Sequence, residues 1–118
     1  MDRTLFTERM KTISTMSNAE INDVIVKSIN SNLVDGNSRG HRNLIIVMEE
    51  LAELSQEVSK SLRNKEDINA LLEESADVVI CIKYIQEIFG ITDEELNKAV
   101  SVKIERISNV IEQDGVYL

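Results

Sequence analysis

Apolar side chains recur at helical spacing along most of the chain. Isoleucine, leucine and valine fall three or four positions apart within four stretches, at about 17–32, 43–62, 68–89 and 92–109. This spacing puts them on one side of an α-helix, so each stretch is predicted to form an amphipathic helix. Residues 1–16 follow the pattern less regularly, and we interpret them as a short or frayed helix at the periphery.

Residues that begin and end helices flank these stretches. Two S/T-x-x-E sequences, Ser17–Glu20 and Thr92–Glu95, are predicted capping boxes, in which a hydroxyl and a carboxylate satisfy free backbone amides. Asp67 is a suitable N-cap, and Gly90 is a suitable helix end. The segment 35–40 contains two glycines among turn-forming side chains and is predicted to be a flexible loop.

Helices joined by short connections are typical of a bundle, so we predict a single all-α domain over residues 1–118 that resembles a four-helix bundle. The stretch 68–89 is apolar around more than half of its circumference, and we expect Tyr84 and Phe89 to lie in the core. A helix in a small monomeric bundle buries a narrower stripe. We therefore expect a second face of this helix to contact another subunit. A helix that is unusually central within one chain is the alternative.

The composition supports this fold class and restricts the partners. The 118 residues contain no proline and four glycines, too few for the turns of a β-sandwich or barrel. Thirteen Lys and Arg residues against 21 Asp and Glu residues give a net charge of −8, which disfavours binding to nucleic acid or to an anionic membrane.

The remaining compositional features indicate a cytoplasmic protein. No apolar run approaches the roughly 20 residues that a bilayer span requires, and the first residues lack the order of a signal peptide. The one cysteine, Cys81, cannot form an internal disulfide, and we expect a buried structural thiol in a reducing compartment.

Two pairs of carboxylates on consecutive predicted helices are the most informative residues. Glu50 and Glu53 lie three positions apart, as do Glu74 and Asp77. The members of each pair therefore stand roughly 60° apart around the helix and one turn along it. Glu74 and Asp77 fall within the apolar arc of their helix, where unpartnered carboxylates would stay protonated or bind a cation. Two such pairs on adjacent antiparallel helices could surround one divalent ion.

The donor set narrows the choice of metal. All-oxygen ligation favours Mg²⁺, with Mn²⁺ as a substitute, over zinc or copper. A di-iron bundle would need Glu-x-x-His on two helices, and the sole histidine, His41, follows the predicted loop. Ordinary surface helices are the alternative, because glutamate favours helix formation. The pairing of two motifs, one of them within an apolar arc, favours the metal site.

These motifs resemble those of the MazG-like family of all-α nucleoside triphosphate pyrophosphohydrolases. The resemblance consists of E-x-x-E at 50–53 and E-x-x-D at 74–77, with about twenty residues between them. His41–Leu44 resembles the lead-in of dCTP pyrophosphatase-type members, and Val102–Arg106 resembles the basic motif on the last core helix of the family. The likeness covers about 40–108, which would be the catalytic core.

The resemblance implies a MazG-type fold and Mg²⁺-dependent cleavage of a (d)NTP to the (d)NMP and pyrophosphate. It implies homodimers or homotetramers with active sites beside the subunit contacts, and it leaves residues 1–16 peripheral and 110–118 as a tail. Glu49 or Glu53 could take the proton from the attacking water, with no covalent nucleophile. The residues that would hold Mg²⁺ are Glu50, Glu53, Glu74 and Asp77, and those that would contact the phosphates are Lys103 and Arg106.

The chain departs from the family pattern in two respects. Arg106 is followed by Ile107 where many members have a second arginine, so a further phosphate contact could come from Lys98 or Arg42. The alternative for the basic motif is a solvated cationic pair near a helix C-terminus.

Tryptophan is absent, so base recognition would depend on His41 and Asn43 or on aliphatic walls. An exposed loop residue is the alternative for His41. Asn97 is a weaker candidate for a phosphate or metal contact, and an exposed helix position is its alternative.

The rival function from another class is a non-catalytic helical module that binds a nucleotide or a protein partner. The presence of all four acidic positions favours the enzyme. Within the enzyme class, a nucleoside diphosphate or a phosphoribosyl-ATP substrate is the near alternative, and the sequence does not fix the base or sugar.

Overall fold

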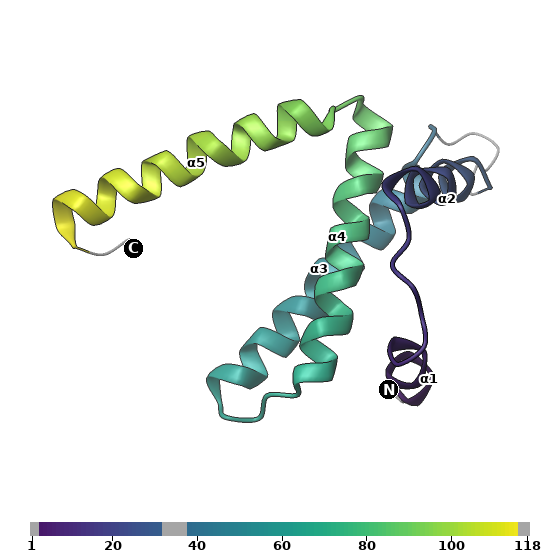
Figure 1. Ribbon diagram of the computed structural model, residues 1–118, viewed down its shortest axis with the longest axis horizontal. Coiled ribbons are helices and arrows are strands. Elements are labelled where there is room, and N and C mark those ends of the chain that lie inside the picture. The colour runs from purple at the N-terminus through teal and green to yellow at the C-terminus, as the bar shows by residue number, and fades with distance from the viewer. Residues whose placement is uncertain (1–2, 32–37, 116–118) are drawn as a thin grey trace.

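The computed structural model describes residues 3–31 and 38–115, and the regular structure in these segments is entirely helical (Figure 1). The five helices are α1 (Thr4–Met10), α2 (Asn18–Ser31), α3 (His41–Leu62), α4 (Ile68–Phe89) and α5 (Asp93–Asp114). The predicted all-α fold is therefore confirmed.

The helix starts are defined by the hydrogen bonds that the sequence predicts. Ser17 Oγ accepts from the Glu20 N–H at 3.2 Å, and Glu20 Oε1 accepts from the Ser17 N–H at 3.2 Å. Thr92 and Glu95 form the same reciprocal pair at the start of α5. The side chain of Asp67 caps α4. Because these contacts satisfy amides that lack an intrahelical partner, they fix where α2, α4 and α5 begin.

The helix ends agree less closely with the prediction. The helix α4 has the predicted bounds, but α5 continues to Asp114, beyond the predicted end near residue 109. Of the predicted loop at 35–40, residues 35–37 lie outside the described residues. Gly40, at its end, has a φ of 83° and immediately precedes α3.

The packed part of the molecule is formed by α2, α3 and α4. The helices α3 and α4 lie antiparallel along much of their length, and α2 packs against α4 (Figure 1). The Asn43 amide donates to Ser28 Oγ at 3.2 Å, and Ser28 Oγ lies 3.2 Å from the Tyr84 hydroxyl, so one polar network joins the three helices. The fully or nearly fully buried apolar side chains are Ile25, Ile29, Val47, Ala70 and Cys81.

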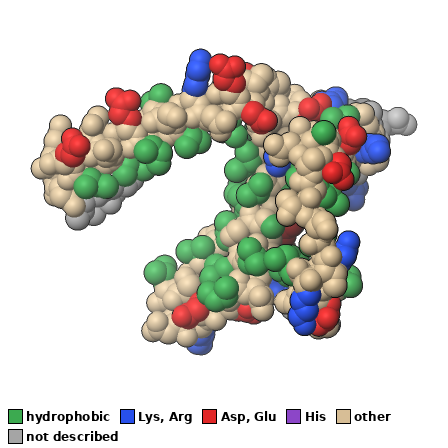
Figure 2. All heavy atoms as spheres, viewed as in Figure 1, with side chains coloured by type: hydrophobic (Ala, Val, Ile, Leu, Met, Phe, Trp, Pro, Cys, Tyr) green, Lys and Arg blue, Asp and Glu red, His purple; other side chains and the backbone are tan. Residues whose placement is uncertain are grey.

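The helix α5 leaves α4 at Gly90 and extends away from the other helices (Figure 1). It contains no buried residue, and apolar side chains lie along the side that faces the concave part of the molecule (Figure 2). Phe89, which the sequence pattern placed in the core, is 62% exposed. That expectation was wrong, because α5 does not fold back to cover the end of α4. Within one chain, the fourth helix of the predicted bundle is therefore not packed.

In the described part of the chain, no helix meets the length and hydropathy needed to cross a bilayer.

Candidate metal centre

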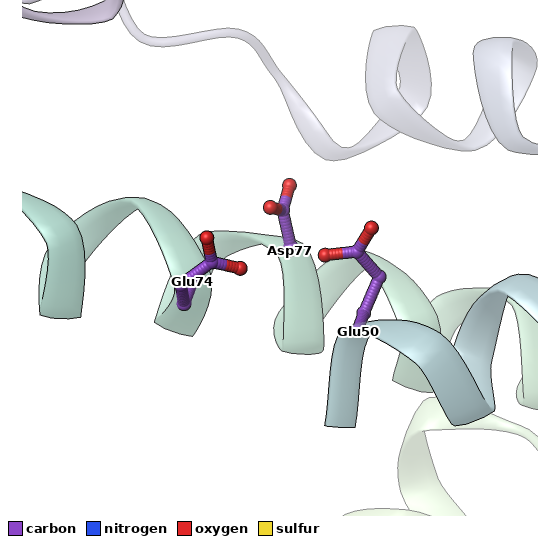
Figure 3. Close-up of side chains that lie close together, drawn as sticks. All are labelled: Glu50, Glu74 and Asp77. Carbon is purple, nitrogen blue, oxygen red and sulfur yellow. The ribbon is translucent and has the colours of Figure 1, made fainter. Parts of the chain in front are cut away.

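Three carboxylates meet between α3 and α4. Glu50 comes from α3, while Glu74 and Asp77 come from successive turns of α4 (Figure 3). Each residue contributes one carboxylate oxygen, and these three oxygens all lie within 4.8 Å of one another. The three-residue separation of Glu74 and Asp77 puts both on the side of α4 that faces α3. The sequence-predicted convergence of two acidic motifs is therefore present in the fold.

The cluster lies in the largely buried interface between α3 and α4, which together form an antiparallel helical hairpin. Glu74 is 4% exposed, Asp77 and Glu50 are half-buried, and Glu74 belongs to the apolar arc as predicted. Buried carboxylates are costly when ionised, since hydration is lost and the charges repel one another.

Burial raises the pKa of two members of the cluster. Desolvation, followed by the charge and hydrogen bond of Asp77, raises the pKa of Glu50 to about 7. Desolvation, followed by the charge and hydrogen bond of Glu53, raises the pKa of Glu74, while Arg3 opposes this effect. The raised pKa values favour the protonated form of both carboxyl groups, and a hard cation bound to them would compete with the proton.

One oxygen of Glu50 and one of Glu74 are buried without a hydrogen-bond donor among the described residues. Among the described residues, none donates to the buried Oε2 atoms of Glu50, Glu74 and neighbouring Glu57. An unsatisfied buried carboxylate oxygen is destabilising and is a natural ligand for a cation.

The other two candidate carboxylates are more exposed. Glu53 lies at the edge of the cluster and contacts Glu74. Glu49 is exposed on α3 and does not belong to the group of three. Three of the four predicted metal ligands therefore converge, and the fourth adjoins them.

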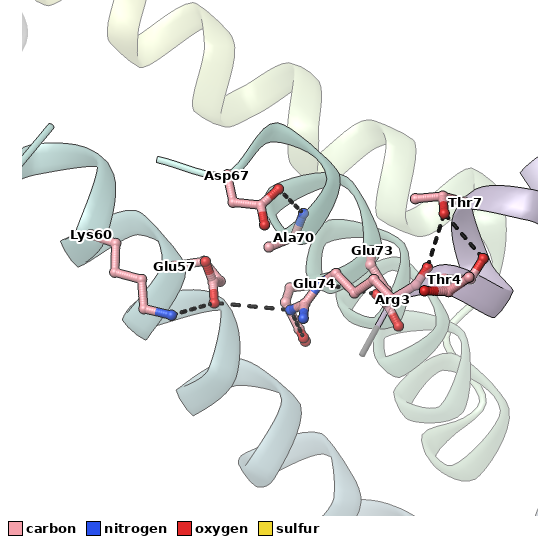
Figure 4. A network of polar contacts seen from close by, with 9 residues as sticks. All are labelled: Arg3, Thr4, Thr7, Glu57, Lys60, Asp67, Ala70, Glu73 and Glu74. Atoms are coloured by element: carbon pink, nitrogen blue, oxygen red, sulfur yellow. Dashed lines mark hydrogen bonds and ion pairs between the residues drawn. The ribbon is translucent and has the colours of Figure 1, made fainter. Parts of the chain in front are cut away.

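Arg3 is the site residue that sequence reasoning missed. Its Nη2 lies 3.2 Å from Glu74 Oε1 and 3.9 Å from Glu57 Oε1, and its Nε lies 3.1 Å from Glu73 Oε2 (Figure 4). A helix-wheel analysis cannot detect this contact, because 71 residues separate Arg3 from Glu74. Residues 1–16 were interpreted as peripheral, and Arg3 shows that this segment reaches the acidic cluster.

The predicted phosphate-binding residues lie on α5, away from the acidic cluster between α3 and α4 (Figure 1). Lys103 and Arg106 are exposed on α5, which Figure 1 shows extending away from the α3–α4 hairpin. Asn97 is also exposed on α5, and Lys98 on this helix pairs with Glu94 at 3.6 Å.

The candidate base-recognition residues begin α3. His41 and Arg42 are exposed there, so they are open to a ligand. Asn43 is fully buried, and its amide donates to Ser28 Oγ. Its place in the network that joins α2, α3 and α4 leaves it no exposed surface for contact with a nucleotide, so the prediction for Asn43 is not supported in this conformation.

Cys81 lies one turn along α4 from Asp77. It is 2% exposed, and burial, followed by the charges of Glu50 and Asp77, raises its pKa to about 11. The raised pKa favours the protonated thiol at neutral pH, and the prediction that Cys81 is buried is confirmed.

Comparison with known proteins adds no family assignment: no family model, curated protein or solved structure matches the chain significantly.

Proposed function

We propose that the protein is a Mg²⁺-dependent nucleotide pyrophosphohydrolase that cleaves a (d)NTP to the (d)NMP and pyrophosphate. The convergence of Glu50, Glu74 and Asp77 within 4.8 Å is the observation that carries the proposal. The spacing of their motifs resembles that of the MazG-like family, which supplies the choice of reaction.

The donor set fits a hard divalent cation. The cluster contains carboxylate oxygens only, and Mg²⁺ and Mn²⁺ prefer such ligands. The Oε2 atoms of Glu50 and Glu74 could act as metal ligands, because no group among the described residues donates a hydrogen bond to them. A cation there would also relieve the repulsion between the buried carboxylates.

The residues of the cluster take distinct roles in this proposal. Glu50, Glu74 and Asp77 hold the cation, and Glu53 joins them from the edge of the cluster. When bound, Mg²⁺ supplies positive charge to the phosphate oxygens and lowers the pKa of an attacking water. Glu53 or Glu49 accepts the proton of that water, since both are accessible on α3.

A second copy of the chain completes the site in this proposal. Most of the stability of a helix in a protein comes from packing of its amphipathic face, and α5 has an apolar stripe with no buried residue. Association would cover the stripe and bring Lys103 and Arg106 of one copy towards the acidic cluster of another. In such a homodimer or homotetramer, Lys103 and Arg106 could contact the substrate of a neighbouring copy, although they lie far from the acidic cluster of their own chain.

Turnover of a nucleotide panel tests the function. Purified protein with MgCl₂ is expected to release pyrophosphate from at least one (d)NTP. Glu74→Gln is expected to lower the rate at least a hundredfold, because it removes a buried ligand charge. Glu66→Gln, at an exposed position of the α3–α4 connector, is the matched control and should retain the wild-type rate.

Two other results would redirect the proposal. Calorimetry that detects nucleotide binding with Mg²⁺, but no product at high enzyme concentration, would favour the non-catalytic module. Cleavage of a nucleoside diphosphate or phosphoribosyl-ATP in place of every triphosphate would keep the enzyme class and change the substrate.

A further inference from the structure

A polar pocket lies directly beside the acidic cluster. Its volume is about 230 Å³, below the 300–1,000 Å³ of pockets that take drug-sized ligands. This size suits a phosphate group better than a whole nucleotide. The residues that line it are Arg3, Glu53, Gln56, Glu57, Lys60 and Glu74.

Arg3 is held in this pocket by carboxylates. Its side chain is 16% exposed, although Arg3 immediately precedes α1, a short helix that contains no buried residue. The guanidinium contacts Glu73 and Glu74 at 3.1 and 3.2 Å (Figure 4). A planar guanidinium suits phosphate because its N–H groups match two oxygens at once.

Lys60 supplies a second cation from α3. Its Nζ lies 3.0 Å from Glu57 Oε1, and its side chain is 47% exposed, so the ammonium stands at the open side of the pocket. The two cations approach from different elements and share Glu57 as a partner (Figure 4).

The charge balance makes the pocket sensitive to a metal. Two cations face three lining carboxylates, so the pocket alone does not attract an anion. A divalent cation on Glu74 and its neighbours would offset much of the negative charge of these carboxylates, so Arg3 and Lys60 could attract an anion. The Oε2 atoms of Glu57 and Glu74 are buried and have no hydrogen-bond partner among the described residues. These two pocket oxygens are therefore free to accept a cation or a hydrogen bond from a ligand.

From this arrangement we infer that Arg3 and Lys60 form the seat for the phosphate chain released as pyrophosphate. The inference rests on the proposed function, since the metal supplies the charge that lets a polyphosphate enter. Arg3 and Lys60 act in ground-state binding of the phosphates, and neither of them is a ligand of the metal. Lys103 and Arg106 would then be additional contacts from a second copy.

Calorimetry with two separate probes tests this inference on the full chain. Mn²⁺ alone reports the metal site, and inorganic pyrophosphate in saturating Mg²⁺ reports the phosphate seat. Arg3→Gln and Lys60→Gln are each expected to weaken pyrophosphate binding at least tenfold. Their affinity for Mn²⁺ is expected to stay within threefold of wild type or to become tighter, because a competing cation has been removed.

Lys11→Gln is the matched control. Lys11 also pairs with a carboxylate, Glu8 at 3.2 Å, but it is 69% exposed and does not line the pocket. The control changes the net charge equally and should bind both probes as wild type does. Lys60→Gln alters a half-exposed side chain on α3, so it keeps the test valid if Arg3→Gln detaches α1 and fails to fold.

The outcomes separate this inference from the proposed function. If wild type binds both probes and both variants bind pyrophosphate as tightly as wild type, the phosphate seat is refuted and the metal site stands. Variants that bind Mn²⁺ more tightly, with unchanged pyrophosphate affinity, would make Arg3 and Lys60 counter-ions only. If wild type does not bind Mn²⁺, the proposed function fails together with the inference.

Discussion

Glu50 and Glu74 occupy positions where a carboxylate opposes folding unless a proton or cation joins it. Both side chains lose hydration in the α3–α4 hairpin and lie beside other acidic side chains, so the pKa of each is raised. Arg3 offsets part of this repulsion at Glu74. The cluster therefore links the stability of the metal-free protein to pH.

This linkage has a definite sign for Glu50. Its pKa is about 7 in the folded protein and near 4.5 in the unfolded chain, so the folded state binds the proton more tightly. The resulting stabilisation is present below pH 4.5 and is lost as the pH rises to about 7. In EDTA, the urea midpoint of wild type should fall between pH 5 and pH 8, and that of Glu50→Gln should fall less.

The control for this experiment is Glu66→Gln, which should keep the wild-type slope. Equal slopes for wild type and Glu50→Gln would show that the carboxyl group is not perturbed by its surroundings. Added Mg²⁺ should stabilise wild type more at pH 8 than at pH 5, because the metal competes with protons for the same oxygens.

The carboxylates of the acidic cluster could be predicted from the sequence, whereas the contact of Arg3 with them could not. Glu74 and Asp77 were predictable because local helix geometry determines which face they occupy. The position of Arg3 depends on how an exposed linker places α1 against the hairpin, and no local periodicity encodes this. Asn43 was predicted to contact a ligand, but its side chain belongs to a buried hydrogen-bond network that joins α2, α3 and α4. Local periodicity does not encode this network either.

At the scale of the elements, the helices begin and end where local chemistry directs. The bounds of α4 were predictable because Asp67 and Gly90 act through hydrogen bonds and φ values within one turn of the helix end. Gly40 has a role that depends on packing as well. It precedes α3 with a φ of 83° in a buried position, and a Cβ there would lie 2.5 Å from the Ile88 side chain.

Gly40→Ala is therefore expected to destabilise the protein by about 2–3 kcal/mol. The left-handed backbone costs an alanine about 1 kcal/mol, and the overlap with Ile88 adds about 1–2 kcal/mol. Gly90→Ala is the matched control, since Gly90 has a φ of 70° but nothing within 4 Å of its added Cβ. Urea denaturation should show the larger loss for Gly40→Ala, and equal losses would remove the packing role of Gly40.

At the scale of the whole molecule, the position of α5 differs most from the expected bundle. The sequence predicts the amphipathic character of α5 correctly, with Leu96, Val100, Ile104 and Ile107 at helical spacing. Periodicity does not specify which surface covers that stripe, because a neighbour in the same chain and one in another copy produce the same pattern. The exposure of Ile104 (58%) and Val100 (51%) favours association with another copy.

Self-association through α5 can be tested with a charge on its apolar stripe. Ile104→Glu is expected to shift the protein to monomers in sedimentation or light-scattering measurements, because it would bury a charge in the interface. Asn109→Glu adds the same charge at an exposed position on the opposite side of α5 and should leave the assembly intact. A wild-type protein that is monomeric at high concentration would contradict the assembly.

The most direct test of the metal centre is anomalous scattering from crystals soaked in Mn²⁺. One strong peak is expected between Glu50, Glu74 and Asp77, with their oxygens as ligands, and it should be absent in Glu74→Gln crystals soaked in the same way. Wild-type crystals with no peak there, and with the carboxyl groups still paired with one another and with Arg3, would contradict a metal centre at this site.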